Sequence, residues 1–245
     1  IEPKMVKSAK VGLFLNKFKT PKIFEYDTIS NDDKWGELFD VIVANPPFFT
    51  PKEGIKPHNL FSVQSKKTEV TFSSYIIDHL KTKGRAGIIV PNGIVENVKR
   101  SGGYYYKLRE LFIANGLYAI VSLPEGVFGR YSATTSTSIL FFDKSTDYEK
   151  ILRLEINNDG FNLGAQRYKI ESNDLPEAKQ VLSEFKDKSK ITSTHLNYQL
   201  IEKRKILDDI NCSLDLRKYV PSNDGMKCKK AIYKVGDIFD IKKGV

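Results

Sequence analysis

The sequence has almost none of the residues that build metal sites or disulfide frameworks. Cysteine occurs twice in 245 residues, at Cys212 and Cys228, and histidine occurs three times at scattered positions. Two distant cysteines outside any paired motif predict no zinc site and no disulfide scaffold, and are typical of a reducing cytoplasm. The sequence also lacks an apolar run of membrane-spanning length and a signal peptide. We therefore expect a cytoplasmic protein without a metal.

Acidic residues are also fewer than basic ones. The chain has 39 Lys and Arg against 30 Asp and Glu, which gives a net charge of +9 and a pI of about 9.3. A basic balance favours a polyanionic partner such as DNA, without proving one. Hydrophobic residues make up 40% of the chain, enough for the core of one large domain or of one domain with an appendage.

The most informative segment is 39–49, in which a short apolar strand runs into Asn45-Pro46-Pro47-Phe48. Proline has a fixed φ and no N–H, and it pushes the residue before it into extended geometry, so these residues predict a rigid turn. The Asn45 side-chain oxygen and the Pro46 carbonyl are suited to accept hydrogen bonds from an exocyclic amino group, and Phe48 is suited to stack on a base. The alternative is an ordinary proline-rich turn after a strand.

At these residues the sequence resembles the amino-methyltransferase family, and phenylalanine in the last place is typical of DNA adenine-N6 methyltransferases. More narrowly, residues 2–219 are similar to the modification subunit of type I restriction-modification systems. Other segments share this resemblance: Thr68–Phe72, Gly84–Gly93, Leu123–Phe128 and Asn158–Phe161. The resemblance implies a Rossmann-like, S-adenosylmethionine-dependent enzyme that acts on double-stranded DNA with specificity and restriction subunits or fused domains.

The resemblance also implies where the cofactor binds. Glu2 stands where the family has an acidic residue on the ribose hydroxyls, and Asp27 where it has one at the cofactor's adenine. The alternative for Asp27 is that it caps a turn. The family's glycine-rich cofactor loop would precede Glu2, and no Gly-x-Gly stretch occurs in the sequence. We therefore expect a catalytic domain truncated at its N-terminus, and a fragment that is inactive by itself.

A base inside a duplex must be flipped out before an enzyme can modify it, and aromatic stacking holds the flipped base. The resemblance implies a second aromatic residue opposite Phe48, with Phe128 as first candidate and Tyr131 as second. The alternative is that Phe128 is a core residue. Basic residues on two loops near the expected site are candidates for phosphate contacts or form a solvated face: Lys52, Lys56, Lys66, Lys67, Lys99 and Arg100.

Helical and strand patterns alternate along the chain, which predicts a layered α/β sheet. The sequence predicts helices at 5–16, 69–81 and 104–115, and strands at 21–26, 39–44, 86–91, 118–123 and 137–142. We expect three parts: a partial methyltransferase domain at 1–150, a helical extension at 151–230, and the start of a truncated specificity domain at 231–245. The extension is predicted to hold helices at 175–186, capped by Asp174, and at 195–210.

Two other functions are compatible with the sequence. A methyltransferase that acts on an RNA base or on a protein glutamine uses a similar motif, although the extension and the specificity-like tail disfavour both. A non-catalytic DNA-binding module with a relic fold is the alternative from another class. The sequence lacks the Pro-Cys nucleophile that cytosine-C5 chemistry requires.

Overall fold

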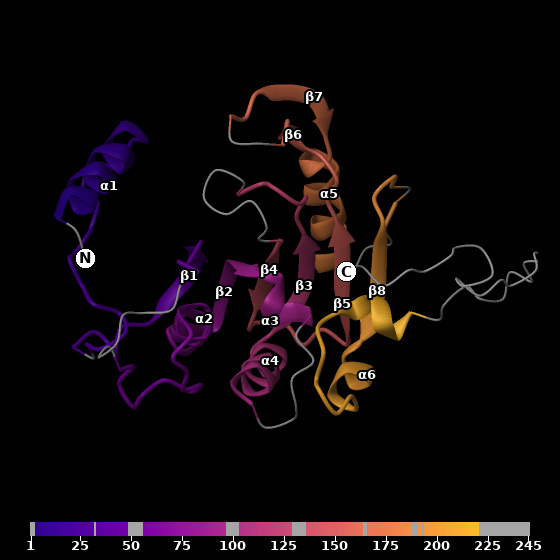
Figure 1. Cartoon of the computed structure of the whole chain (residues 1–245), viewed down its shortest axis with the longest axis horizontal. Coiled ribbons are helices and arrows are strands. Elements are labelled where there is room, and N and C mark those ends of the chain that lie inside the picture. Colours follow the sequence, from indigo (N-terminus) through magenta and orange to yellow (C-terminus); the bar gives the residue numbers. More distant parts are fainter. Residues whose placement is uncertain are drawn as a thin grey trace, which may run out of the picture.

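A computed structural model shows helices and strands that alternate through most of the chain (Figure 1). It describes residues 3–31, 33–48, 56–96, 103–128, 136–163, 166–187, 191–192 and 194–220. The elements are α1 (Pro3–Leu15), β1 (Phe39–Ala44), α2 (Thr68–Asp78), β2 (Leu80–Pro91), α3 (Asn92–Glu96), α4 (Tyr104–Ala114), β3 (Leu117–Ser122), β4 (Thr137–Asp143), β5 (Lys150–Glu155), β6 (Asp159–Phe161), β7 (Lys169–Asn173), α5 (Leu175–Lys186), β8 (Tyr198–Glu202), α6 (Lys203–Leu207) and the 3₁₀ turn η1 (Leu216–Tyr219). No helix in these ranges is long and apolar enough to cross a membrane.

Six strands form the central sheet in the order β1-β2-β4-β3-β5-β8. β1 is parallel to β2 and β3 is parallel to β5, whereas β4 runs antiparallel to both of its neighbours and β8 antiparallel to β5. The carboxyl ends of β1, β2, β3 and β5 therefore share one edge of the sheet, here termed the carboxyl edge. This mixed sheet confirms the predicted α/β class. β6 and β7 form a separate hairpin, at the top of Figure 1.

Helices cover the two faces of the sheet unequally. α2, α3 and α4 enclose one core against the sheet, in which Ile88 and Phe112 are fully buried. α5 covers the β3 and β5 part of the other face through Ala178 and Val181. β3 is buried on both faces and is apolar almost throughout, as expected of a central strand. β1 lies at the end of the sheet, and 83% of Val43 remains exposed.

One predicted strand does not form. Residues 21–27 have no regular secondary structure, although the pattern of 21–26 predicted a strand. Strand backbone groups need a neighbour to bond with, and none of the described segments pairs with these residues. β1 forms with its predicted bounds, and the other predicted strands form with shifted ends; β2 starts at Leu80, well before its predicted start. The expected helices correspond to α1, α2, α4 and α5, and the loop expected after β2 begins with the short helix α3.

The region after residue 150 is mixed rather than helical. β5 and β8 add two strands to the sheet, and the helix predicted at 195–210 is β8 followed by the short helix α6. Residues 198–202 pair with β5, whose backbone would otherwise present a free edge, and this tertiary pairing overrides the local helical pattern. The prediction of a helical extension at 151–230 is corrected accordingly. Residues 231–245 lie outside the described residues.

Asp174 occupies the position before α5, as predicted, but its carboxylate does not cap the helix. It accepts hydrogen bonds from the backbone N–H groups of Asn157 and Asn158, both at 2.8 Å. The Asn173 side-chain oxygen instead accepts from the backbone N–H of Leu175 at 3.0 Å. These bonds attach the base of the β6–β7 hairpin to the start of α5.

Candidate active site

The Asn-Pro-Pro-Phe turn lies at the carboxyl edge, directly after β1. β1 ends at Ala44, and residues 45–48 have no regular secondary structure. Asn45 is exposed, the following Pro46 is buried, and Phe48 is half-buried. Pro46 is buried and its φ is fixed, and a proline also restricts the residue that precedes it. The exposed Asn45 amide is therefore presented from a rigid backbone.

Helix α2 supports this turn from its N-terminal end. The hydroxyl of Thr68, the first residue of α2 and fully buried, donates a hydrogen bond to the Pro47 carbonyl at 3.2 Å. Glu69, in the same first turn, accepts a hydrogen bond from the Tyr105 hydroxyl of α4 at 3.1 Å. Burial, and after it the Glu69 carboxylate, raises the pKa of Tyr105, so its hydroxyl stays a donor. The motif turn, α2 and α4 are thus linked by polar bonds.

Sequence reasoning did not identify Thr68 as a site residue. Its contact with Pro47 joins positions 21 residues apart, across a segment in which no local pattern signals the approach. A threonine at the first turn of a helix, after a proline-rich strand end, is the weak signal that was available.

Phe128 lies in the connection that leaves β3 at the same carboxyl edge. Residues 125–128 form a turn in which Gly126 has φ +82°, a left-handed conformation that favours glycine. Phe128 is half-buried, so it is not an enclosed core side chain. Because β2 and β4 separate β3 from β1, the two connections start roughly 14 Å apart, at about 4.8 Å per strand. The structure thus places Phe48 and Phe128 on one edge, on loops of strands that are not neighbours.

The acidic residues predicted at the cofactor are described only in part. Glu2 lies outside the described residues. Asp27 is exposed, and its carboxylate is used by its own turn: Oδ1 accepts from the backbone N–H of Ile29 at 3.0 Å, and the Ser30 hydroxyl donates to Oδ2. The hydrogen bond from Ser30 is the main cause that lowers the pKa of Asp27. In this conformation Asp27 caps a turn.

An apolar hollow of about 520 Å³ lies beside Asn45, over the face of the sheet formed by β1, β2 and β4. Its floor includes Val43, Ile89 and Phe141. The side chain of Lys186, from α5, also lines it. The amide of the motif therefore opens, on one side, onto apolar surface rather than onto a polar cleft.

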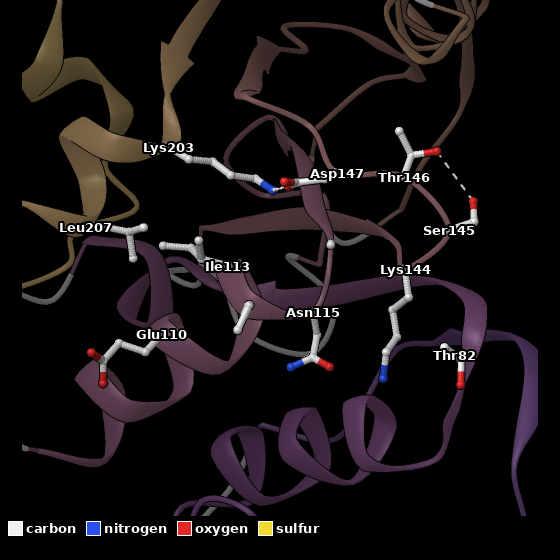
Figure 2. Close-up of a pocket in the computed structure, with 12 residues that line it drawn as sticks. Thr82, Glu110, Ile113, Asn115, Lys144, Ser145, Thr146, Asp147, Lys203 and Leu207 are labelled. Atoms are coloured by element: carbon white, nitrogen blue, oxygen red, sulfur yellow. Dashed lines mark hydrogen bonds and ion pairs between the residues drawn. The ribbon is translucent and has the colours of Figure 1, made fainter.

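A larger hollow of about 800 Å³ lies at the opposite edge of the sheet (Figure 2). Its lining combines the C-terminal end of α4 with the chain after β4, and includes the ion pair between Lys203 and Asp147 at 3.1 Å. None of the predicted site residues that the structure describes lines this hollow. The candidate active site is therefore at the carboxyl edge, although the larger hollow is elsewhere.

Half of the basic residues predicted to contact phosphates are described. Lys56 and Lys66 are exposed, and Lys67 is half-buried directly before α2. The other three predicted basic residues lie outside the described residues: Lys52, Lys99 and Arg100. Tyr131, the second candidate for base stacking, lies outside them as well.

A parallel strand that ends in Asn-Pro-Pro-Phe, at the carboxyl edge of a mixed α/β sheet, defines the class of amino-methyltransferases. Residues 1–224 match the family model of the N-6 DNA methylases, and the chain belongs to this family.

Characterised relatives in the same family are methylase subunits of type I restriction enzymes. The chain is 34% identical over 146 residues to the EcoEI methylase subunit of Escherichia coli, a match that covers 57% of this chain and 28% of that protein. It is 31% identical over 146 residues to the MjaIX methylase subunit of Methanocaldococcus jannaschii, covering 54% of this chain and 25% of that protein. The matched part therefore spans about a quarter of the length of these relatives.

Solved structures of such subunits have the same fold. The EcoKI M protein has a TM-score of 0.68 at 18% identity, over 88% of this chain and 51% of that one. The methyltransferase subunit of a type I restriction-modification system from Streptococcus thermophilus has a TM-score of 0.63 at 16% identity, over 87% of this chain and 46% of that one. The predicted methyltransferase-type fold is thereby confirmed.

Proposed function

We propose that this chain is the catalytic part of a DNA methyltransferase that transfers a methyl group from S-adenosylmethionine to the N6 amino group of adenine. The observation that carries the proposal is the turn at the end of β1, where exposed Asn45 stands on buried Pro46 and Thr68 bonds the next carbonyl. Membership of the N-6 DNA methylase family and the methylase subunits among the relatives support it.

In this proposal the chain's own residues act on the amino group. The Asn45 side-chain oxygen and the Pro46 carbonyl accept hydrogen bonds from the two amino hydrogens, which draws the nitrogen lone pair out of conjugation with the ring. The prolines hold both acceptors before the substrate arrives, so little reorganisation is needed. S-adenosylmethionine supplies the methyl group, and no enzyme nucleophile is required because the amino nitrogen is itself the nucleophile.

The base reaches this turn after it is flipped out of the duplex. Phe48 stacks on one of its faces and Phe128 on the other, each from a loop of the carboxyl edge. Lys56 and Lys66, which are exposed in the segment that precedes α2, neutralise phosphates without reading sequence.

The rest of the reaction depends on polypeptide beyond the described site. We propose that residues 1–150, together with the strands β5 and β8 that complete their sheet, form the catalytic domain, with Glu2 and Asp27 contributing to the cofactor site beside a glycine-rich loop. Residues 231–245 would begin a specificity domain, and specificity and restriction functions would come from partner subunits or fused domains. The names of the relatives, which are methylase subunits of restriction enzymes, support this assembly.

Substitution of Asn45 by Ala in the full-length protein tests the proposal. Loss of one preorganised acceptor lowers the rate of such reactions roughly 10²- to 10³-fold, so transfer of radiolabelled methyl to duplex DNA should nearly vanish while cofactor affinity changes little. Asn16→Ala is the matched control, because Asn16 is exposed just after α1 and bonds only locally to Gly12. Near-normal turnover by Asn45→Ala contradicts the assignment.

The same assay separates the alternatives when other acceptors are offered to the unsubstituted protein. Transfer to RNA or to a protein glutamine, with none to DNA, identifies the related methyltransferase functions. DNA binding without transfer to any acceptor identifies a non-catalytic module.

A further inference from the structure

The β6–β7 hairpin carries a segment, Asn158–Phe161, that the proposed reaction does not use. Between its strands lies Arg167, whose guanidinium leaves the hairpin and reaches the loop that carries Phe128. Its Nη1 donates a hydrogen bond to the Val127 carbonyl at 3.1 Å, and its Nε donates to the Asn162 carbonyl at 3.3 Å. One side chain thus joins the hairpin to the connection after β3, 40 positions away.

The hairpin holds this guanidinium firmly. Arg167 Nη2 bonds both carboxylate oxygens of Asp159, at 2.5 and 2.6 Å, and the Asp159 side chain is only 12% exposed. The guanidinium also lies 5.4 Å from the centre of the Phe161 ring, within reach of a cation–π contact. Because all three guanidinium nitrogens are engaged and Asp159 balances the charge, Arg167 is not arranged as a phosphate contact.

The loop itself has few other restraints among the described residues. At its neck the Leu123 N–H donates to the Thr137 carbonyl at 3.0 Å, and within the turn the Val127 N–H donates to the Pro124 carbonyl at 3.4 Å, a long bond. The Val127 carbonyl belongs to the peptide group that leads directly into Phe128. A charged donor on that carbonyl therefore fixes the peptide plane from which the Phe128 side chain departs.

We propose that Arg167 is a positioning residue for Phe128, and that Asp159 and the β6–β7 hairpin serve to hold it there. The inference rests on the proposed function, since it gives Phe128 the role of stacking on the flipped base. Arg167 itself touches neither base nor cofactor. The hairpin thus acts as a brace that presets the aromatic face before DNA binds.

Two substitutions test the brace in the full-length protein, with 2-aminopurine at the target adenine as the probe of base flipping. Arg167→Met removes every polar bond of this side chain. Arg167→Lys keeps a cation for Asp159 but lacks the planar guanidinium, which bonds Asp159 and the Val127 carbonyl at the same time. We expect about tenfold less flipped base in both variants, which corresponds to ~1.4 kcal/mol. The Lys variant should keep a melting temperature close to that of the unsubstituted protein. Flipping by Arg167→Lys at the unsubstituted level overturns the proposal.

A double-mutant cycle shows whether Arg167 acts through Phe128. In a Phe128→Ala background, Arg167→Lys should cause no additional loss of flipping, because the ring to be positioned is gone. Additive losses overturn the proposal, as does a decrease of about one in the slope of log affinity against log salt, which identifies a phosphate contact. Arg204→Ala is the control, since Arg204 is exposed on α6 and its ion pair with Asp208 is long, at 3.8 Å.

Failure of the proposed function gives a different result. An unsubstituted protein that neither flips nor methylates adenine in DNA refutes the function itself. An unsubstituted protein that does both, while Arg167→Lys is indistinguishable from it, refutes the brace alone.

Discussion

Replacing Phe128 with Ala separates base stacking from core packing. Phe128 is half-buried on a loop, whereas Phe112 of α4 is fully buried and packs edge-on against Phe142, with ring centres 5.2 Å apart. Truncating a buried Phe costs ~3–5 kcal/mol, and ~1 kcal/mol lowers the melting temperature of a chain of this size by ~2–4 °C. Phe112→Ala should therefore melt ~6–20 °C lower, and Phe128→Ala only a few degrees lower.

The stacking role predicts a large functional effect for the same change. Loss of one stacking face costs ~1–3 kcal/mol, so Phe128→Ala should reduce the flipped population of a 2-aminopurine base roughly ten- to hundredfold. Phe48→Ala should act similarly, and Phe48→Tyr should retain flipping because its ring face survives. The reasoning is refuted if Phe128→Ala melts as low as Phe112→Ala and flips the base normally per folded molecule.

Three further predictions concern stability and the cofactor. Gly116→Ala should lower the free energy of unfolding, measured in denaturant, by ~2 kcal/mol or more. Gly116 has φ +81°, and a Cβ there would lie 2.3 Å from the Asp143 carbonyl oxygen. The control Gly36→Ala should change the free energy of unfolding little, because the space around Gly36 is open. His79 is fully buried, and burial lowers its pKa. The unfolded chain therefore takes up a proton more readily at this residue, and the stability of the folded state should fall as pH drops below about 6.5. Urea unfolding at pH 7.5 and 5.5 should show this loss, and His79→Phe should diminish it. The 245-residue chain alone should bind S-adenosylmethionine weakly or not at all in calorimetry, and tight stoichiometric binding would reveal a cofactor site formed by other residues.

The parts of the site that follow from local chemistry could be predicted from the sequence. Two consecutive prolines after an apolar strand restrict the backbone whatever surrounds them, so the rigid turn at Asn45 follows from residues 39–48 alone. The periodic helices α1, α4 and α5 were predictable for the same reason, since each has a face set by its own sequence.

The parts that depend on distant partners could not be predicted. Residues 21–26 have strand-like composition but no described neighbour, while residues 198–202 sit in a helix-like charged stretch and form a strand because β5 offers its edge. The support of the motif by Thr68 and the bond from Arg167 to Val127 likewise join remote positions. Asp27 caps its own turn, which is the alternative that the sequence left open, and its assignment to the cofactor stays a prediction.

The antiparallel direction of β4 has a consequence for how this fold can change. Because β4 runs back between β2 and β3, residues 123–136 leave the sheet and return to it at the same edge, and the bond from Leu123 N–H to the Thr137 carbonyl closes their neck. No crossover has to be rebuilt when such a connection lengthens, and the entropy of loop closure grows only slowly with length. The segment that carries Phe128, which we propose to stack on the target base, is therefore exchangeable, because insertions there would leave the hydrophobic layers untouched.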